Sequence, residues 1–111
     1  MSDVMADRRE SPRYALILPA EVVDLATTAV LTARSSDVSR TGCYIDTLNP
    51  IPLASRVTVQ LRRGDATFES TARVVYVCPG LGMGLHWGTN PTPEKQRILD
   101  QWLAEAARSG G

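Results

Sequence analysis

The chain has 111 residues, no formal net charge at pH 7, and 12 basic and 12 acidic side chains. This length suits one domain, and the 43% of hydrophobic residues is enough for a core. A neutral chain has no overall basic field to hold long nucleic acid, so an anionic ligand would have to be small and held locally. No apolar run approaches the ~18 residues of a membrane span.

The two ends of the chain differ in composition from the middle. Residues 1–10 mix acidic and basic side chains, which does not fit a signal peptide, and we expect them to form a mobile arm. The end, residues 108–111, is expected to be a flexible tail, which leaves a single domain at residues 8–107. Cys43 and Cys78 lack CxxC spacing and are expected to be reduced; with one histidine they do not make up a zinc site.

Six segments have the pattern of short strands. Residues 56–62 alternate strictly between polar and apolar side chains. Residues 67–77 form another long run, in which every second residue from Phe68 to Tyr76 shares one face, and its small middle residues, Ser70 and Ala72, would let a closed barrel bend. Gly64 is expected to have a positive φ in the turn between them. The other candidates are residues 16–24, 29–36, 43–47 and 83–87. Six short strands at close spacing predict a mainly β fold, an antiparallel barrel or sandwich.

The last part of the chain changes to a helical period. Thr92 is expected to cap a helix, with Pro93 in its first turn and Glu94 at the positive end of its dipole. The apolar residues that follow form one stripe: Ile98, Leu99, Trp102, Leu103 and Ala106. We expect this stripe to pack on the strands; the alternative is a helix that binds a partner protein.

Three arginines, Arg8, Arg9 and Arg13, lie within the sequence RRESPR. Pro12 disfavours helix at the residue before it, so the segment should be extended, and Arg9 and Arg13 then point the same way with Cα atoms roughly 13 Å apart. Guanidinium groups bond phosphate oxygens in pairs, read the guanine edge and stack on flat rings. The segment therefore suits one medium-sized anion, unless it is a solvated arm.

A second polar sequence, DVSRTG, spans residues 37–42. Asp37 and Ser39 share a face if the chain is extended; Asp37 can accept from the N–H groups of a guanine, and Ser39 can donate or accept. Gly42 permits a turn before the next strand. The alternative is an Asx or Ser turn that joins two strands and is closed by Gly42.

Three further residues have two readings each. Gly84 lies in a strand, where a glycine marks either close approach of a ligand or curvature of a barrel. Tyr76 could stack on a base, but its period groups it with Phe68 and Val74, so we expect it in the core. His86 is expected to be an outward strand residue, because no catalytic constellation accompanies it.

The order of these sequences resembles the PilZ domain family, bacterial receptors for cyclic di-GMP. The family's RxxxR matches Arg9 to Arg13, with the extra basic residue Arg8 before it. Its (D/N)xSxxG matches residues 37–42, and its late glycine-rich strand resembles residues 82–85. The resemblance covers residues 8–105 and includes both motifs in full.

The resemblance implies a six-stranded antiparallel PilZ-type β-barrel with a C-terminal helix, whose ligand lies across the outer surface. The arginines of RxxxR would reach phosphates and guanine edges, Asp37 and Ser39 would hold a guanine, and Gly42 would keep the backbone low. The resemblance suggests that the residue before RxxxR affects how many ligand molecules bind: with Arg8 there, an intercalated pair of cyclic di-GMP molecules is one expectation, and a single molecule is the alternative. The resemblance implies no other cofactor, a cytoplasmic location in a bacterium, a monomer or weak dimer, and a signal passed on to a partner protein.

Two other functions stay open beside the receptor. A PilZ-like adaptor that works by protein contact alone would be indicated by loss of a motif arginine, and both are present. A small nucleic-acid-binding barrel would show a strongly salt-dependent affinity for oligonucleotides, which zero net charge does not favour. An enzyme is not expected, because no group is placed to act as base and nucleophile.

Overall fold

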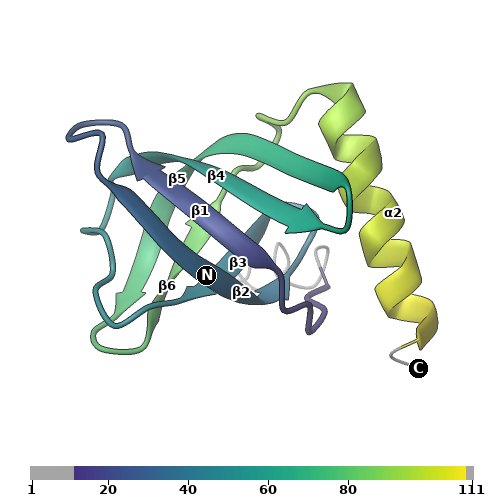
Figure 1. Cartoon of the computed structure of the whole chain (residues 1–111), viewed down its shortest axis with the longest axis horizontal. Helices are drawn as coiled ribbons and strands as arrows, with labels where there is room; N and C mark the ends of the chain where they lie inside the picture. The colour runs from purple at the N-terminus through teal and green to yellow at the C-terminus, as the bar shows by residue number, and fades with distance from the viewer. Residues whose placement is uncertain (1–11, 110–111) are drawn as a thin grey trace, which may run out of the picture.

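The computed structural model describes residues 12–109 and contains six strands and one helix. The strands form a closed antiparallel barrel in the order β1-β2-β3-β6-β5-β4, and the helix α2 lies at one end of it (Figure 1). This is the predicted fold. The elements are β1 (Pro19–Asp24), β2 (Val30–Val38), β3 (Gly42–Asp46), β4 (Arg56–Arg63), β5 (Ala66–Cys78), β6 (Gly82–His86) and α2 (Pro93–Ser109).

The alternation of polar and apolar residues places the core inside the barrel. On β4, Val57, Val59 and Leu61 are fully buried, as their spacing predicts. The turn into β5 contains Gly64 with a φ of 59°, also as predicted. In the core the rings of Phe68 and Trp87 pack against each other, with centroids 4.8 Å apart. The inside of the barrel is therefore filled by packed apolar side chains, and polar groups lie on its outer face.

The strand β1 begins at Pro19 and not, as predicted, at Leu16. The segment before it is held by Ser35, a fully buried residue of β2. The Ser35 hydroxyl donates to the carbonyl of Leu16 at 2.7 Å and accepts from the amide of Leu18 at 3.1 Å. One side chain thus satisfies backbone groups that a regular ladder would otherwise pair.

The helix α2 begins as its sequence predicts. The Thr92 hydroxyl accepts a hydrogen bond from the amide of Lys95 at 3.2 Å, and the Thr92 carbonyl accepts one from Gln96 at 2.8 Å. The apolar stripe packs on the barrel, with Leu99, Trp102 and Leu103 buried. The helix continues to Ser109, two residues into the segment expected to be a tail.

Both cysteines are free thiols, Cys43 buried and Cys78 half-buried. Burial, and to a smaller extent the charge of Asp37, raises the pKa of the Cys43 thiol far above its ordinary value, so this thiol stays protonated and unreactive. Within residues 12–109, the one helix is not long and apolar enough to cross a membrane.

Candidate functional site

Two β-bulges shape the outer wall of the barrel. The register of β2 against β3 shifts between Ser35 and Asp37, and the register of β5 against β6 shifts between Val74 and Tyr76. An extra residue in one strand reverses the side to which the following side chains point. Ser35 and Val74 therefore face the core, while Asp37 and Tyr76, two positions later, face outward.

The bulges align four residues in one row across the outer face. Asp37 is the cross-strand partner of Tyr44, Tyr44 is the partner of Gly84, and Gly84 is the partner of Tyr76. The row thus crosses β2, β3, β6 and β5 and brings together residues 37 and 76, which are distant in the sequence. We call these four residues the tyrosine row.

The prediction that Tyr76 lies in the core was wrong. Its period groups it with Phe68 and Val74, which are buried, but Tyr76 itself is 42% exposed. The bulge after Val74 is the physical reason, because it turns the side chain of Tyr76 to the outside. The next inward position is taken by Val77, which packs against the core.

The two tyrosines lie over glycines of β6. A Cβ atom at Gly84 would meet the ring of Tyr76 at 2.3 Å, and one at Gly82 would meet the ring of Tyr44 at 2.6 Å. The two rings are stacked on each other, with centroids 6.0 Å apart and planes 28° apart. The glycines therefore let the rings lie low on the wall, where they form an aromatic surface. Gly84 thus allows the ring of Tyr76 to lie close to the backbone of β6. The sequence predicted approach of a ligand or curvature of the barrel at this glycine, and not contact with a tyrosine.

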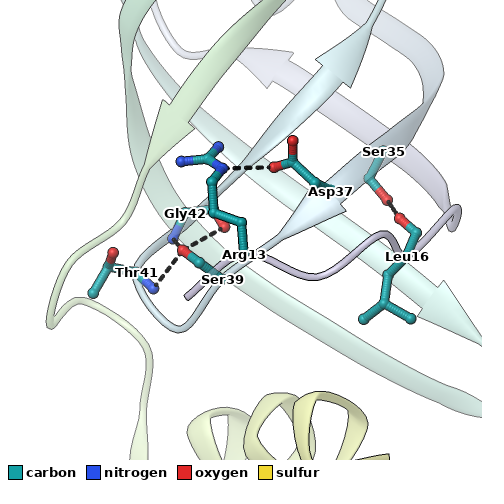
Figure 2. A network of polar contacts seen from close by, with 7 residues as sticks. All are labelled: Arg13, Leu16, Ser35, Asp37, Ser39, Thr41 and Gly42. Carbon is teal, nitrogen blue, oxygen red and sulfur yellow. Dashed lines mark hydrogen bonds and ion pairs between the residues drawn. The ribbon is translucent and has the colours of Figure 1, made fainter. Parts of the chain in front are cut away.

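Arg13 and Asp37 meet beside this surface. The Nε of Arg13 donates to Oδ1 of Asp37 at 2.9 Å, although the residues come from the two separate motifs (Figure 2). The approach is fixed by the neighbouring residues, because Tyr14 and Val38 exchange both backbone hydrogen bonds at 2.9 Å. The contact is made through Nε, so both Nη groups of Arg13 and the second oxygen of Asp37 remain able to bond a ligand.

The charges of this pair act on Tyr76. Burial raises the pKa of Tyr76 above its ordinary value; Arg13 opposes that shift and Asp37 adds to it. The phenol is therefore neutral at physiological pH, and the two charged groups lie close enough to the ring to affect its ionisation. A flat neutral ring beside an arginine and a carboxylate offers the three contacts that a purine base uses: stacking, a donor and an acceptor.

Ser39 lies under the surface and holds the turn between β2 and β3. Its hydroxyl accepts from the amides of Thr41 and Gly42 and donates to the carbonyl of Gly42, each at 3.2 Å (Figure 2). The residue is 2% exposed. This geometry is the Ser turn that the sequence left open as an alternative, and the contact of Ser39 with a ligand stays a prediction.

Gly42 is required by close approach of two strands. A Cβ atom there would lie 2.2 Å from the carbonyl oxygen of Leu85 on β6, and the residue does not have a positive φ. Glycine therefore lets the start of β3 pair tightly with β6 at the edge of the site.

Of the three arginines predicted to bind the ligand, Arg8 and Arg9 lie outside the described residues, so the structure places Arg13 alone among them.

The family model of the PilZ domain matches residues 7–105. The chain belongs to the PilZ domain family. No curated protein matches the sequence. Because the match spans both motifs and the whole barrel, this PilZ domain carries its two motif segments on the fold that the resemblance implied.

Solved PilZ structures have the same fold at low sequence identity. The PilZ domain of YcgR from Escherichia coli, solved with c-di-GMP, superposes with a TM-score of 0.74 at 16% identity, covering 93% of this chain and 94% of that one. The PilZ domain of CeSA from a cellulose-synthesizing bacterium gives 0.66 at 18% identity, covering 83% and 94%. The Bacillus subtilis inhibitor of motility MotI/DgrA gives 0.78 at 14% identity; 92% of this chain matches, but it spans only 52% of that protein.

Sequence reasoning missed Tyr44, which lies at the centre of the tyrosine row. Its neighbours Cys43 and Ile45 are buried, so the alternation of β3 already indicated that Tyr44 points outward. What the alternation lacks is any sign that the ring of Tyr76, two strands away, lies stacked against it.

Proposed function

We propose that this PilZ domain is a receptor for cyclic di-GMP and not an enzyme. The observation that carries the proposal is the meeting of Arg13 and Asp37, one residue from each motif, on an outer wall that also presents Tyr76. Family membership supports the choice of ligand, as do two YcgR structures from Escherichia coli that contain c-di-GMP.

Each residue has a distinct part in the proposed binding. The free Nη groups of Arg13 donate to a phosphate or to the O6/N7 edge of a guanine. The second oxygen of Asp37 accepts from guanine N1–H and N2–H, and the ring of Tyr76 stacks on the base. Arg8 and Arg9 are proposed to reach the phosphates from the segment that precedes Arg13.

The Arg13–Asp37 pair suits a site that must open to its ligand. Both side chains are partly exposed, 43% and 34%, and an ion pair at such a position contributes only about 0–1 kcal/mol to stability. Ligand groups can therefore replace or extend the contact at low cost, while the pair keeps both side chains near their working positions.

The output is proposed to be a change in surface that a partner protein reads. Engagement of Arg8, Arg9 and Arg13 by one ligand fixes the position of residues 8–13 against the barrel wall. Such a contact changes the exposed surface without any change in the barrel, and a binding partner could select the new surface. The fold similarity to an inhibitor of motility is compatible with a role as an adaptor.

Isothermal titration of cyclic di-GMP tests this proposal. We expect micromolar or tighter binding by the wild type and a loss of about tenfold or more in Arg13→Gln and Asp37→Asn, because each removes a charged hydrogen-bonding group. Arg63→Gln and Glu105→Gln are matched controls, since this ion pair between β4 and α2 has almost the same exposure, 42% and 33%. Equal affinity in all four variants, or no heat from the wild type, would contradict the proposal; the second result would favour a ligand-independent adaptor.

A further inference from the structure

A second row of side chains lies next to the tyrosine row on the outer wall. Gly42 is the cross-strand partner of His86, His86 is the partner of Arg73, and Arg73 is the partner of Arg56. This row crosses β3, β6, β5 and β4, and the side chains of His86, Arg73 and Arg56 are exposed. Two arginines and a histidine therefore stand side by side on three neighbouring strands; we call them the basic row.

The basic row lines a depression of about 570 Å³ in the barrel wall. Its polar lining residues are Arg56, Thr71, Arg73, His86, Thr89 and Asn90. The lining contains hydrogen-bond donors and no carboxylate. Its chemistry is therefore that of a site for an anion.

Neither arginine of the basic row has a carboxylate within 4 Å in the part of the chain that the structure describes. Four other arginines, at positions 13, 34, 40 and 63, each have a carboxylate within 4 Å, whereas none forms such a pair with Arg56 or Arg73 within residues 12–109. Like charges directly opposite each other on adjacent strands destabilise a sheet. The repulsion between Arg56 and Arg73 is present although the chain as a whole has no net charge. An anion bound between the two arginines would remove this repulsion.

The position of the basic row connects it with the proposed ligand site. On β5, Arg73 precedes Tyr76, and on β6, His86 follows Gly84 by two residues on the same face. Two residues of a strand span about 7 Å, and three strand spacings from Asp37 to Tyr76 span about 14 Å. A ligand that lies on the tyrosine row with one end at Asp37 would thus have its other end close to Arg73.

We propose that Arg73 and Arg56, flanked by His86, form a second anion subsite that takes a phosphodiester of the bound cyclic dinucleotide. This inference rests on the proposed function and extends it, because it assigns contacts on β4 and β5 that neither sequence motif contains. The ligand surface then has a cation at both ends, Arg13 on one side and the basic row on the other, with the tyrosine rings between them.

The test is a titration of cyclic di-GMP into Arg73→Gln and Arg56→Gln, with Arg62→Gln as the matched control. Arg62 is an exposed arginine of β4 that lies outside the depression. We expect about tenfold weaker binding in the first two variants and wild-type affinity in the control. The melting temperatures of the first two variants should be unchanged or higher, since a like-charge contact is removed, so that weaker binding cannot be ascribed to unfolding.

A second experiment uses inorganic phosphate to distinguish a subsite for the phosphodiester of cyclic di-GMP from a subsite for free phosphate. Phosphate should weaken the binding of cyclic di-GMP to the wild type more than to Arg73→Gln, because it competes for the same subsite. If Arg73→Gln loses phosphate binding but binds cyclic di-GMP as the wild type does, the subsite does not serve the dinucleotide. A wild type that binds no cyclic di-GMP contradicts the proposed function itself; a wild type that binds, with both variants unchanged, contradicts this inference alone.

Discussion

Replacement of Gly42 by alanine tests whether tight pairing of β3 with β6 supports the site. The added Cβ would lie 2.2 Å from the carbonyl oxygen of Leu85, whereas such contacts need at least 3.0 Å. The obstacle is backbone, so the two strands must separate, and overpacking of this kind costs about 2–3 kcal/mol. With an unfolding entropy of about 2 cal/mol/K per residue, a domain of this size should then melt about 10–15 °C lower.

Thermal unfolding followed by circular dichroism measures this effect. Gly64→Asn is the control, because Gly64 has a φ of 59° with nothing within 4 Å of an added Cβ, and asparagine tolerates that conformation. We expect the control to melt within about 3 °C of the wild type. A melting temperature of Gly42→Ala equal to that of the control would refute the close approach as the reason for glycine.

Four further predictions concern stability, binding and pH. Thr92→Ala should remove the helix cap and lower the melting temperature by about 5 °C, since a cap contributes about 1 kcal/mol. Ser35→Ala should lower the free energy of unfolding by about 1–3 kcal/mol, because it leaves the buried amide of Leu18 without its acceptor; chemical denaturation measures this change. Tyr76→Ala should weaken cyclic di-GMP binding about tenfold in a titration, since stacking on a base contributes about 1–3 kcal/mol. The hydrogen bond from Arg63 holds the pKa of Glu105 below its ordinary value. The Arg63–Glu105 pair therefore stabilises the fold at a pH above the ordinary glutamate pKa, and this stabilisation is lost as the pH falls through the lowered pKa. A double-mutant cycle of Arg63 and Glu105, repeated at several pH values, measures this stabilisation.

The regular parts of the fold could be predicted because their signals are local. The strict alternation of residues 56–62 predicted the buried face of β4, and Thr92 and Pro93 predicted the start of α2. The candidate site was predicted as far as its motif residues, and the structure brings Arg13 and Asp37 together. These predictions depend on period, capping and motif spacing, which the sequence contains directly.

The aromatic half of the surface could not be predicted, because no residue type marks a β-bulge here. A strict period of two places Tyr76 in the core, and the single extra residue after Val74 reverses it. The same event before Asp37 turns that carboxylate outward.

The proposed receptor function requires that cyclic di-GMP binds on the outer wall of the barrel that the two bulges shape. The most direct measurement is the change in backbone amide chemical shifts of ¹⁵N-labelled protein during titration with cyclic di-GMP. We expect the largest changes at Asp37, Tyr44, Gly84 and Tyr76, with β1 little affected. Changes centred on β1, or no change at ligand excess, would contradict it.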